Sequence, residues 1–302
     1  ESFFQHDDNI IILGRGHINY GWDSGIPEFE ENDIKLKAWY DYCYNVAKDT
    51  KGKISKFEVW NEPVLAGFSG RKKNADSELI DDYIKLMETA YTAIKSANPD
   101  AKIAGISQAG IDNAVHFEWF SEVLKQGGWQ YMDAYSFHPY TPTASLDNQA
   151  TKQKSMEKSF AEFEKYGISK ENIEFWFTET GYSLTDIDHD EVLMGNNIAK
   201  DFIYAKSMGY CDEFTVYDAV QDGIVPSYRE HKFGSLNNHL YSLNKVNLSA
   251  TKAYPIITQM NYMLADAEPD RVVKYNDDVD IYLYKSNKFN KDIGILWSRG
   301  NS

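Results

Sequence analysis

Short apolar runs alternate along this chain with longer segments in which apolar residues recur every three or four positions. The short runs are rich in β-branched and aromatic residues, which is typical of strands, and the longer period is that of an amphipathic helix. We expect strands at Asn9–Leu13, Lys56–Trp60, Ala101–Ile106, Met132–Phe137, Ile173–Phe177 and Asp212–Tyr217. We expect helices at Asp33–Lys48, Ser77–Ala97, Ala114–Lys125, Lys152–Tyr166, Glu191–Met208 and Thr251–Ala265. Strands that alternate with helices predict an α/β fold with a parallel sheet.

The pattern changes near residue 268. From there the apolar residues alternate with polar ones over Val272–Tyr275, Asp280–Tyr284 and Ile293–Trp297, with turn-forming residues between them. This is the pattern of antiparallel strands joined by hairpins. We therefore expect a first domain over residues 1–267 and the start of an accessory β-sandwich over residues 268–302.

Two of the predicted strands end in a glutamate. Glu62 follows Trp60 and Asn61 and precedes a proline, which cannot continue a sheet ladder. Glu179 follows the nearly continuous apolar run Ile173–Phe177, which is typical of a strand buried on both faces. An aromatic ring, an amide and an acid together suit a sugar ligand, and two carboxyls can divide the work of acid and nucleophile. The alternative is that Glu62 only caps a turn beside a buried tryptophan.

Three motifs carry a resemblance to a known group of enzymes. Trp60-Asn61-Glu62-Pro63 and Thr178-Glu179-Thr180-Gly181 resemble the ends of strands four and seven of clan A glycoside hydrolases. Ser136-Phe137-His138-Pro139-Tyr140 resembles the end of their strand six, which carries a His-x-Tyr pair. The segment Ile10–Gly21 is similar to the third strand and loop of glycoside hydrolase family 39, and the resemblance covers about residues 10–265.

The resemblance implies a TIM barrel and a retaining mechanism. Glu62 would be the general acid and base, and Glu179 the nucleophile. Asn61 would bind the sugar hydroxyl next to the reacting carbon. Tyr140 would donate a hydrogen bond to Glu179, and His138 would bind the sugar or orient Glu62. In a retaining enzyme the two carboxyls lie about 5–5.5 Å apart.

Further residues are expected at the substrate. Trp60 would offer an aromatic face, and Tyr217 ends the sixth predicted strand, where clan A enzymes often carry a tryptophan that stacks on the sugar. Gln108, next to Ser107, follows another strand and could reach substrate hydroxyls, although solvation of a loop would explain it equally well. His17, Asn19, Tyr20 and Trp22 could form a distal sugar subsite.

The number of predicted strands is smaller than a barrel needs. Eight strands close a TIM barrel, and six are predicted here. The 55 residues that precede Lys56 hold one clear strand, where three earlier strand–helix units would need far more. We therefore expect that the first two barrel strands are missing from this chain. Clan A enzymes take an arginine near the nucleophile from strand two, and Arg15 is a poor substitute for it.

Composition narrows the function further. The formal net charge is −15, which argues against nucleic acids and anionic membranes as partners because both need basic surfaces. Aromatic residues make up 15% of the chain, which suits a carbohydrate cleft, although large core residues explain most of them. The acidic stretch from Asp186 to Glu191 lacks the spacing of an EF-hand loop, so a solvated loop is expected there. No metal or other cofactor is expected.

The sequence thus predicts a retaining glycoside hydrolase that cleaves β-type bonds of an oligosaccharide or polysaccharide, outside the cell or in the periplasm. The alternative is a catalytically silent carbohydrate-binding barrel, or a fragment too incomplete to act. The sugar, the choice between endo and exo cleavage, and the oligomeric state are left open.

Overall fold

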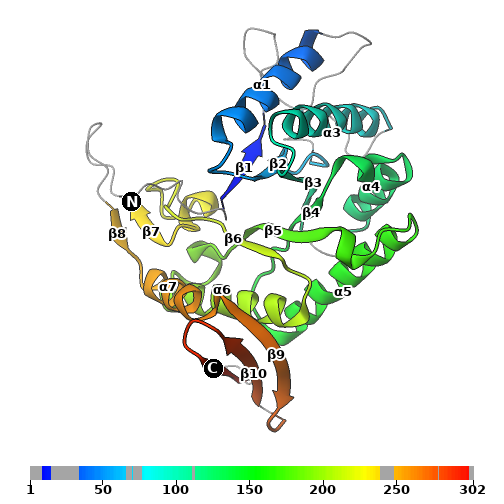
Figure 1. Cartoon of the computed structure of the whole chain (residues 1–302). Coiled ribbons are helices and arrows are strands. Elements are labelled where there is room, and N and C mark those ends of the chain that lie inside the picture. The colour runs from blue at the N-terminus through cyan, green and yellow to red at the C-terminus, as the bar shows by residue number, and fades with distance from the viewer. Residues whose placement is uncertain are drawn as a thin grey trace. The chain divides into compact units, whose positions relative to one another are not determined.

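A computed structural model describes residues 9–14, 34–65, 70, 77–110, 113–238, 248–277 and 279–298. These residues belong to two compact units, which are described separately (Figure 1). The first unit comprises Glu1–His138 and Glu157–Thr178, and the second comprises Pro139–Met156 and Glu179–Ser302. The division falls within strand β5 and within helix α5, so each of these elements contributes to both units.

All six predicted parallel strands are present and form one sheet, with its strands in sequence order. The strands are β1 (Ile10–Leu13), β2 (Lys56–Val59), β3 (Lys102–Ala109), β4 (Ala134–His138), β5 (Glu174–Thr180) and β6 (Glu213–Val216). The four pairings from β1 to β5 are parallel. Parallel strands bring their carboxyl ends to the same edge of the sheet, which is where this fold class binds its ligands.

The predicted helices are confirmed as well. They are α1 (Ile34–Thr50), α3 (Ser77–Ala97), α4 (Ala114–Lys125), α5 (Leu146–Glu164), α6 (Glu191–Met208) and α7 (Ala253–Leu264). Short 3₁₀ turns occur at Gly128–Tyr131, Lys170–Asn172, Leu184–Asp186 and Arg229–Lys232. None of the helices within the described ranges has an apolar stretch that could cross a bilayer.

One helix begins earlier than predicted. α5 starts at Leu146 rather than at Lys152. The prediction missed its first two turns because they are mostly polar and carry no apolar period. A signal for the true start is present in the sequence: the Ser145 hydroxyl accepts a hydrogen bond from the Asn148 amide, as an N-terminal cap does.

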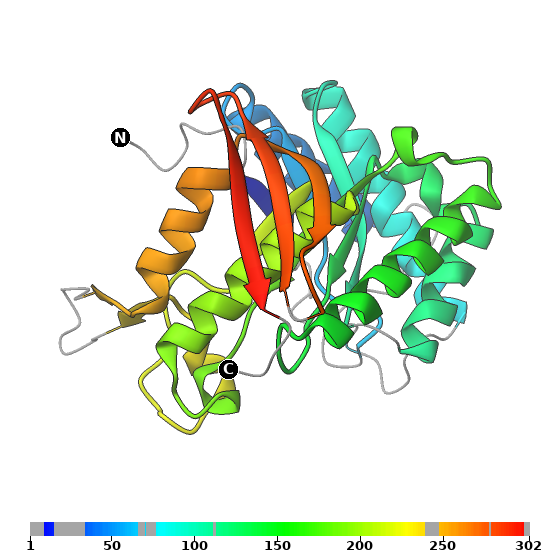
Figure 2. The same cartoon turned by 90° about the horizontal axis from the view of Figure 1, so that it is seen from below.

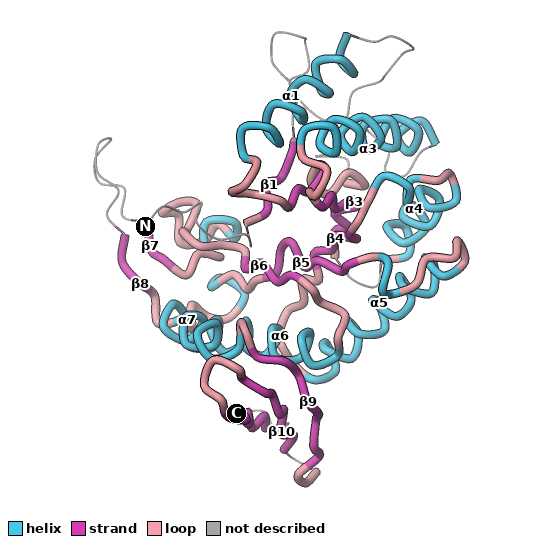
Figure 3. Tube along the Cα trace, viewed as in Figure 1, coloured by secondary structure: helices cyan, strands magenta, loops and turns pink. Residues whose placement is uncertain are grey.

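In the first unit the helices α1 and α3 lie side by side over the strands (Figures 1 and 3). The Trp39 indole of α1 donates to the Leu86 carbonyl of α3 at 2.9 Å, which satisfies the one polar atom of a fully buried ring. Within the sheet itself, Ala104, Ala134 and Trp176 form a cluster from three neighbouring strands. Small residues on two strands make room for the indole on the third.

In the second unit α6 and α7 are adjacent, and Gly195 allows the close approach. A Cβ atom at Gly195 would lie 2.9 Å from the Ala253 Cα. The antiparallel strands β9 (Ala267–Lys274), β10 (Val279–Ser286) and β11 (Lys291–Ser298) form one sheet, seen in orange to red in Figure 2. Tyr284 and Trp297 anchor this sheet in a hydrophobic cluster with α6 and α7 residues. The two-stranded pairing of β7 (Leu236–Asn238) with β8 (Leu248–Ala250) was not predicted, because three-residue strands show no period.

The parallel α/β architecture and the C-terminal antiparallel strands are thus confirmed. The antiparallel sheet begins at Ala267, and the domain boundary at residue 268 stays a prediction. The closed eight-stranded barrel and the loss of its first two strands likewise stay predictions.

Candidate active site

The backbone at the end of β2 adopts a conformation that is rare for large side chains. Trp60 has a φ of 71° and Glu62 a φ of 42°, both in the left-handed region. Hydrogen bonds hold this turn: the Trp60 amide donates to the Leu13 carbonyl at 2.7 Å, and the Glu62 amide donates to Ser107 Oγ at 3.1 Å. Non-glycine residues keep such a conformation only where their surroundings enforce it, and such positions cluster at functional sites.

A second irregularity lies in the neighbouring strand β3. Its pairing with β4 shifts register between Gly105 and Gln108, and Ile106 and Ser107 have φ values of 83° and 45°. The two amides of this bulge are satisfied by side chains, because Ile106 donates to the Tyr83 hydroxyl at 2.8 Å and Ser107 donates to Ser136 Oγ at 2.9 Å. The bulge thereby aims the Ser107 hydroxyl at the Glu62 backbone.

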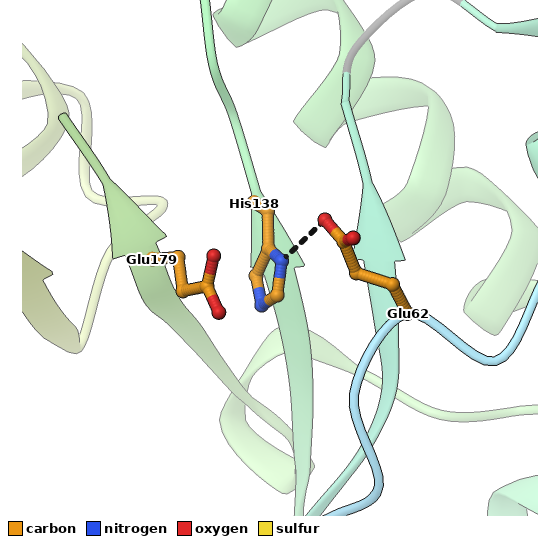
Figure 4. A group of neighbouring side chains, drawn as sticks. All are labelled: Glu62, His138 and Glu179. Carbon is orange, nitrogen blue, oxygen red and sulfur yellow. Dashed lines mark hydrogen bonds and ion pairs between the residues drawn. The ribbon is translucent and has the colours of Figure 1, made fainter. Parts of the chain in front are cut away.

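His138, at the end of β4, contacts Glu62 directly. Figure 4 shows the two side chains facing one another, with imidazole Nδ1 2.9 Å from the Glu62 Oε1. The other ring nitrogen, Nε2, lies 3.2 Å from Thr178 Oγ1 and 3.3 Å from Ser107 Oγ. The His138 side chain is fully buried, whereas the Glu62 side chain is 15% exposed. The histidine therefore links a carboxyl that reaches solvent to a set of buried polar groups.

One of those buried groups is Glu58, which the sequence analysis did not single out. It is fully buried in β2, and its Oε1 accepts a hydrogen bond from the Thr178 hydroxyl at 2.8 Å. The same oxygen lies 4.0 Å from the His138 Nε2. Burial raises the pKa of the Glu58 carboxyl, while the charge of His138 and nearby hydroxyls oppose the rise. The sequence held one signal for Glu58, because it is a charged residue between the apolar Phe57 and Val59 of a predicted strand.

In the second unit, Glu179 lies near the end of β5 and is half-buried (Figure 4). The Tyr140 hydroxyl donates to its Oε2 at 3.0 Å. The Tyr140 ring contacts Tyr217 and Phe233 edge-on, with centroid distances of 6.5 and 5.9 Å. Gly181, which turns the chain after Glu179, is required by close packing, because a Cβ atom there would lie 1.9 Å from the Tyr217 carbonyl oxygen.

Asp218, directly after Tyr217, is a second acid that the sequence analysis missed. Both of its carboxylate oxygens are buried, and the Val220 backbone amide is the one group that favours their ionised form. Burial and the neighbouring Asp222 raise the pKa of Asp218 from 3.8 to about 7. The Tyr217 hydroxyl donates to Asp222 Oδ2 at 3.2 Å, and burial raises the pKa of this phenol too.

Three other predicted substrate residues differ in their surroundings. The Asn61 Oδ1 is buried and lacks a partner within the described part of the chain. Trp60 is only 3% exposed and packs edge-on against Trp39, so little of its ring is accessible. Gln108 is also buried, and its side-chain oxygen accepts from the Tyr135 hydroxyl at 2.8 Å. The roles of all three as substrate ligands stay predictions.

The acidic stretch before α6 has structural partners. Asp186 accepts from the Arg229 guanidinium at 2.8 Å, and the Asp190 carboxylate caps the first turn of α6 through two backbone amides. Arg15 and the predicted distal subsite, His17, Asn19, Tyr20 and Trp22, lie outside the described residues.

Comparison with solved structures finds that this fold is similar to the folds of several glycosidases. No protein-family model and no curated protein matches the sequence. A family 39 glycoside hydrolase from Bacteroides cellulosilyticus WH2 superposes with a TM-score of 0.70 at 19% identity, covering 96% of this chain and 57% of that one. A monomeric β-xylosidase from Caulobacter crescentus CB15 gives 0.51 at 17% identity, with 87% and 53% covered. A family 51 α-L-arabinofuranosidase from Bifidobacterium longum gives 0.59 at 13% identity, with 87% and 60% covered.

The chain thus spans less than two thirds of the length of each of these three proteins. At these identities the likeness concerns the fold. All three neighbours are glycosidases by their printed descriptions, which agrees with the resemblance carried by the three strand-end motifs.

Proposed function

We propose that this protein is a retaining glycoside hydrolase that cleaves β-type glycosidic bonds by double displacement, with Glu62 as general acid and base and Glu179 as nucleophile. The observation that carries the proposal is the different hydrogen-bond partner of each glutamate. Glu62 contacts an imidazole, which can take up and return a proton. Glu179 accepts from a tyrosine, whose hydroxyl favours the ionised carboxylate.

The reaction would proceed in two steps. First, a Glu179 carboxylate oxygen attacks the anomeric carbon, the bond to the leaving oxygen breaks, and Glu62 gives that oxygen its proton. A water molecule then attacks the glycosyl-enzyme, the ester bond to Glu179 breaks, and Glu62 takes the proton of the water. Two inversions give net retention. The mechanism requires both carboxyls to reach the same anomeric carbon.

Substrate binding would rest on residues around these two acids. Asn61 would hold the hydroxyl next to the reacting carbon, and its acceptor oxygen, which has no partner within the described ranges, suits that role. Tyr217 would contribute an aromatic face for a sugar ring. The substrate is an oligosaccharide or polysaccharide, and an uncharged one suits this acidic chain because no charge repulsion opposes its binding. The place of action is extracellular or periplasmic.

The test is azide rescue of Glu179→Ala with an activated aryl glycoside. We expect activity to fall by several orders of magnitude, and azide to restore turnover with formation of a glycosyl azide of inverted configuration. In Glu62→Ala, azide should instead give the azide of retained configuration. Glu174→Ala, at the other end of the same strand β5, is the matched control and should keep its activity.

If azide rescues neither variant, the assignment of the two roles is wrong. If the parent protein binds oligosaccharides but hydrolyses none of a broad glycoside panel, it is a carbohydrate-binding barrel without catalysis.

A further inference from the structure

Behind the proposed acid Glu62 lies a continuous path of polar groups that ends at a buried carboxyl. Glu62 contacts His138 Nδ1, His138 Nε2 lies near the Thr178 hydroxyl, and this hydroxyl donates to Glu58 at 2.8 Å. Each step is 3.2 Å or shorter, so every neighbouring pair is within hydrogen-bond distance. Glu58 itself is fully buried and cannot touch a substrate from its position in β2.

The direction of these hydrogen bonds follows from Glu58. The Thr178 hydroxyl has one proton, and it is given to the Glu58 Oε1. The Thr178 oxygen can therefore only accept from His138, which places a proton on Nε2. A neutral His138 then has its lone pair on Nδ1, facing Glu62, so that the proton between Nδ1 and Oε1 is held by the pair.

We propose that Glu58 is a positioning residue for the general acid: as a buried carboxylate it fixes His138 in the Nε2–H form through Thr178 and keeps the shared proton on the Glu62–His138 pair. This inference rests on the proposed role of Glu62. The Glu58 Oε1 lies 4.0 Å from Nε2, and an ionised carboxylate at that distance in a buried site favours the protonated form of the pair.

The other groups around Glu58 do not supply this charge. Ser107 on β3 and Ser136 on β4 are neutral hydroxyls, and the buried Tyr83 of α3, whose pKa is raised by burial, stays a neutral phenol. Among the described groups that act on Glu58, His138 is the one that can carry a charge opposite to that of the carboxylate. Removal of the Glu58 charge should therefore weaken the binding of a single proton, the one shared by Glu62 and His138.

The first test is made on the parent protein. Labelling with ¹⁵N-histidine, with the His138 signals assigned by their loss in His138→Gln, reports the tautomer directly. We expect the proton on Nε2, and a titration midpoint above the value of about 6.5 for an isolated histidine. A proton on Nδ1 alone, with neutral imidazole at pH 6, overturns the proposal.

The second test is Glu58→Gln, which keeps an oxygen that can accept from Thr178 but removes the charge. We expect the His138 midpoint, and with it the basic limb of the pH profile of kcat/KM, to fall by about 1–3 pH units. Glu122→Gln, which neutralises an exposed acid paired with Lys125 on α4, is the matched control and should move neither. If Glu58→Gln folds and both midpoints stay in place, Glu58 is a neutral structural acid and the proposal is wrong.

The two tests separate this inference from the proposed function. If the parent protein hydrolyses no glycoside, the proposed function fails, while the histidine spectra still decide whether Glu58 sets the state of His138. If Glu58→Gln does not fold, the tautomer in the parent protein decides the question alone.

Discussion

The hydrogen bond from Tyr140 to Glu179 offers the sharpest prediction about the proposed nucleophile. Tyr140→Phe removes only the hydroxyl that donates to Oε2 at 3.0 Å, and the ring keeps its edge-on contacts with Tyr217 and Phe233. The remaining aromatic ring fills the same space, so the change reports the hydrogen bond rather than the packing.

The magnitude follows from the kind of bond. A hydrogen bond to a charged group contributes about 1.5–3 kcal/mol. Glu179 is half-buried, so solvent compensates for part of the loss and the lower end of this range applies. About 1.4 kcal/mol corresponds to one pH unit. The donor stabilises the ionised carboxylate, and its removal favours the protonated form.

We therefore expect the acid limb of kcat/KM to move upward by about one pH unit in Tyr140→Phe, measured with an activated aryl glycoside. Tyr204→Phe is the matched control, because it removes a hydroxyl of the same unit that donates at 2.9 Å to a neutral acceptor, Gln153. An acid limb that stays in place in Tyr140→Phe, or moves equally in the control, would refute the reasoning.

Two further predictions concern the second unit. The buried ion pair Lys152–Asp201, at 2.8 Å, should make Lys152→Met cost about 3–5 kcal/mol in the free energy of unfolding, because an unpaired charge stays buried. The double variant with Asp201→Leu should recover much of this loss in denaturant titrations, and additive losses would contradict the expectation. The raised pKa of Asp218 means that the folded state holds a proton that the unfolded state has released between pH 4 and about 7. The parent protein should therefore lose stability as the pH rises from 4 to about 7, and Asp218→Asn should lose less. Equal losses of the two proteins in pH-dependent thermal unfolding would show that Asp218 ionises normally.

Much of the fold was predictable from the sequence because its signals are local. The two-residue and 3.6-residue periods located all six parallel strands and the six helices that follow the strands or lie between them. The same reasoning placed Glu62 and Glu179 at strand ends, since Pro63 directly follows Glu62 and Gly181 follows Glu179 by two residues.

The surroundings of the strand-end residues could not be predicted in this way. A bulge at Ile106 and Ser107 changes the register of β3, and it leaves Gln108 buried with its oxygen bound to Tyr135. A shift of one residue moves a side chain to the other face of a sheet, and no local pattern announces it.

What the sequence determined by itself was the order of strands and helices and the presence of an acid at two strand ends. The tertiary structure alone decided which partner each acid has. Glu58 contacts Thr178 across 120 residues of sequence, and Glu62 contacts His138 across 76. Both pairs join strands that are not adjacent in the sheet, β2 with β5 and β2 with β4. They therefore depend on the curvature and register of the whole sheet rather than on any segment of the chain.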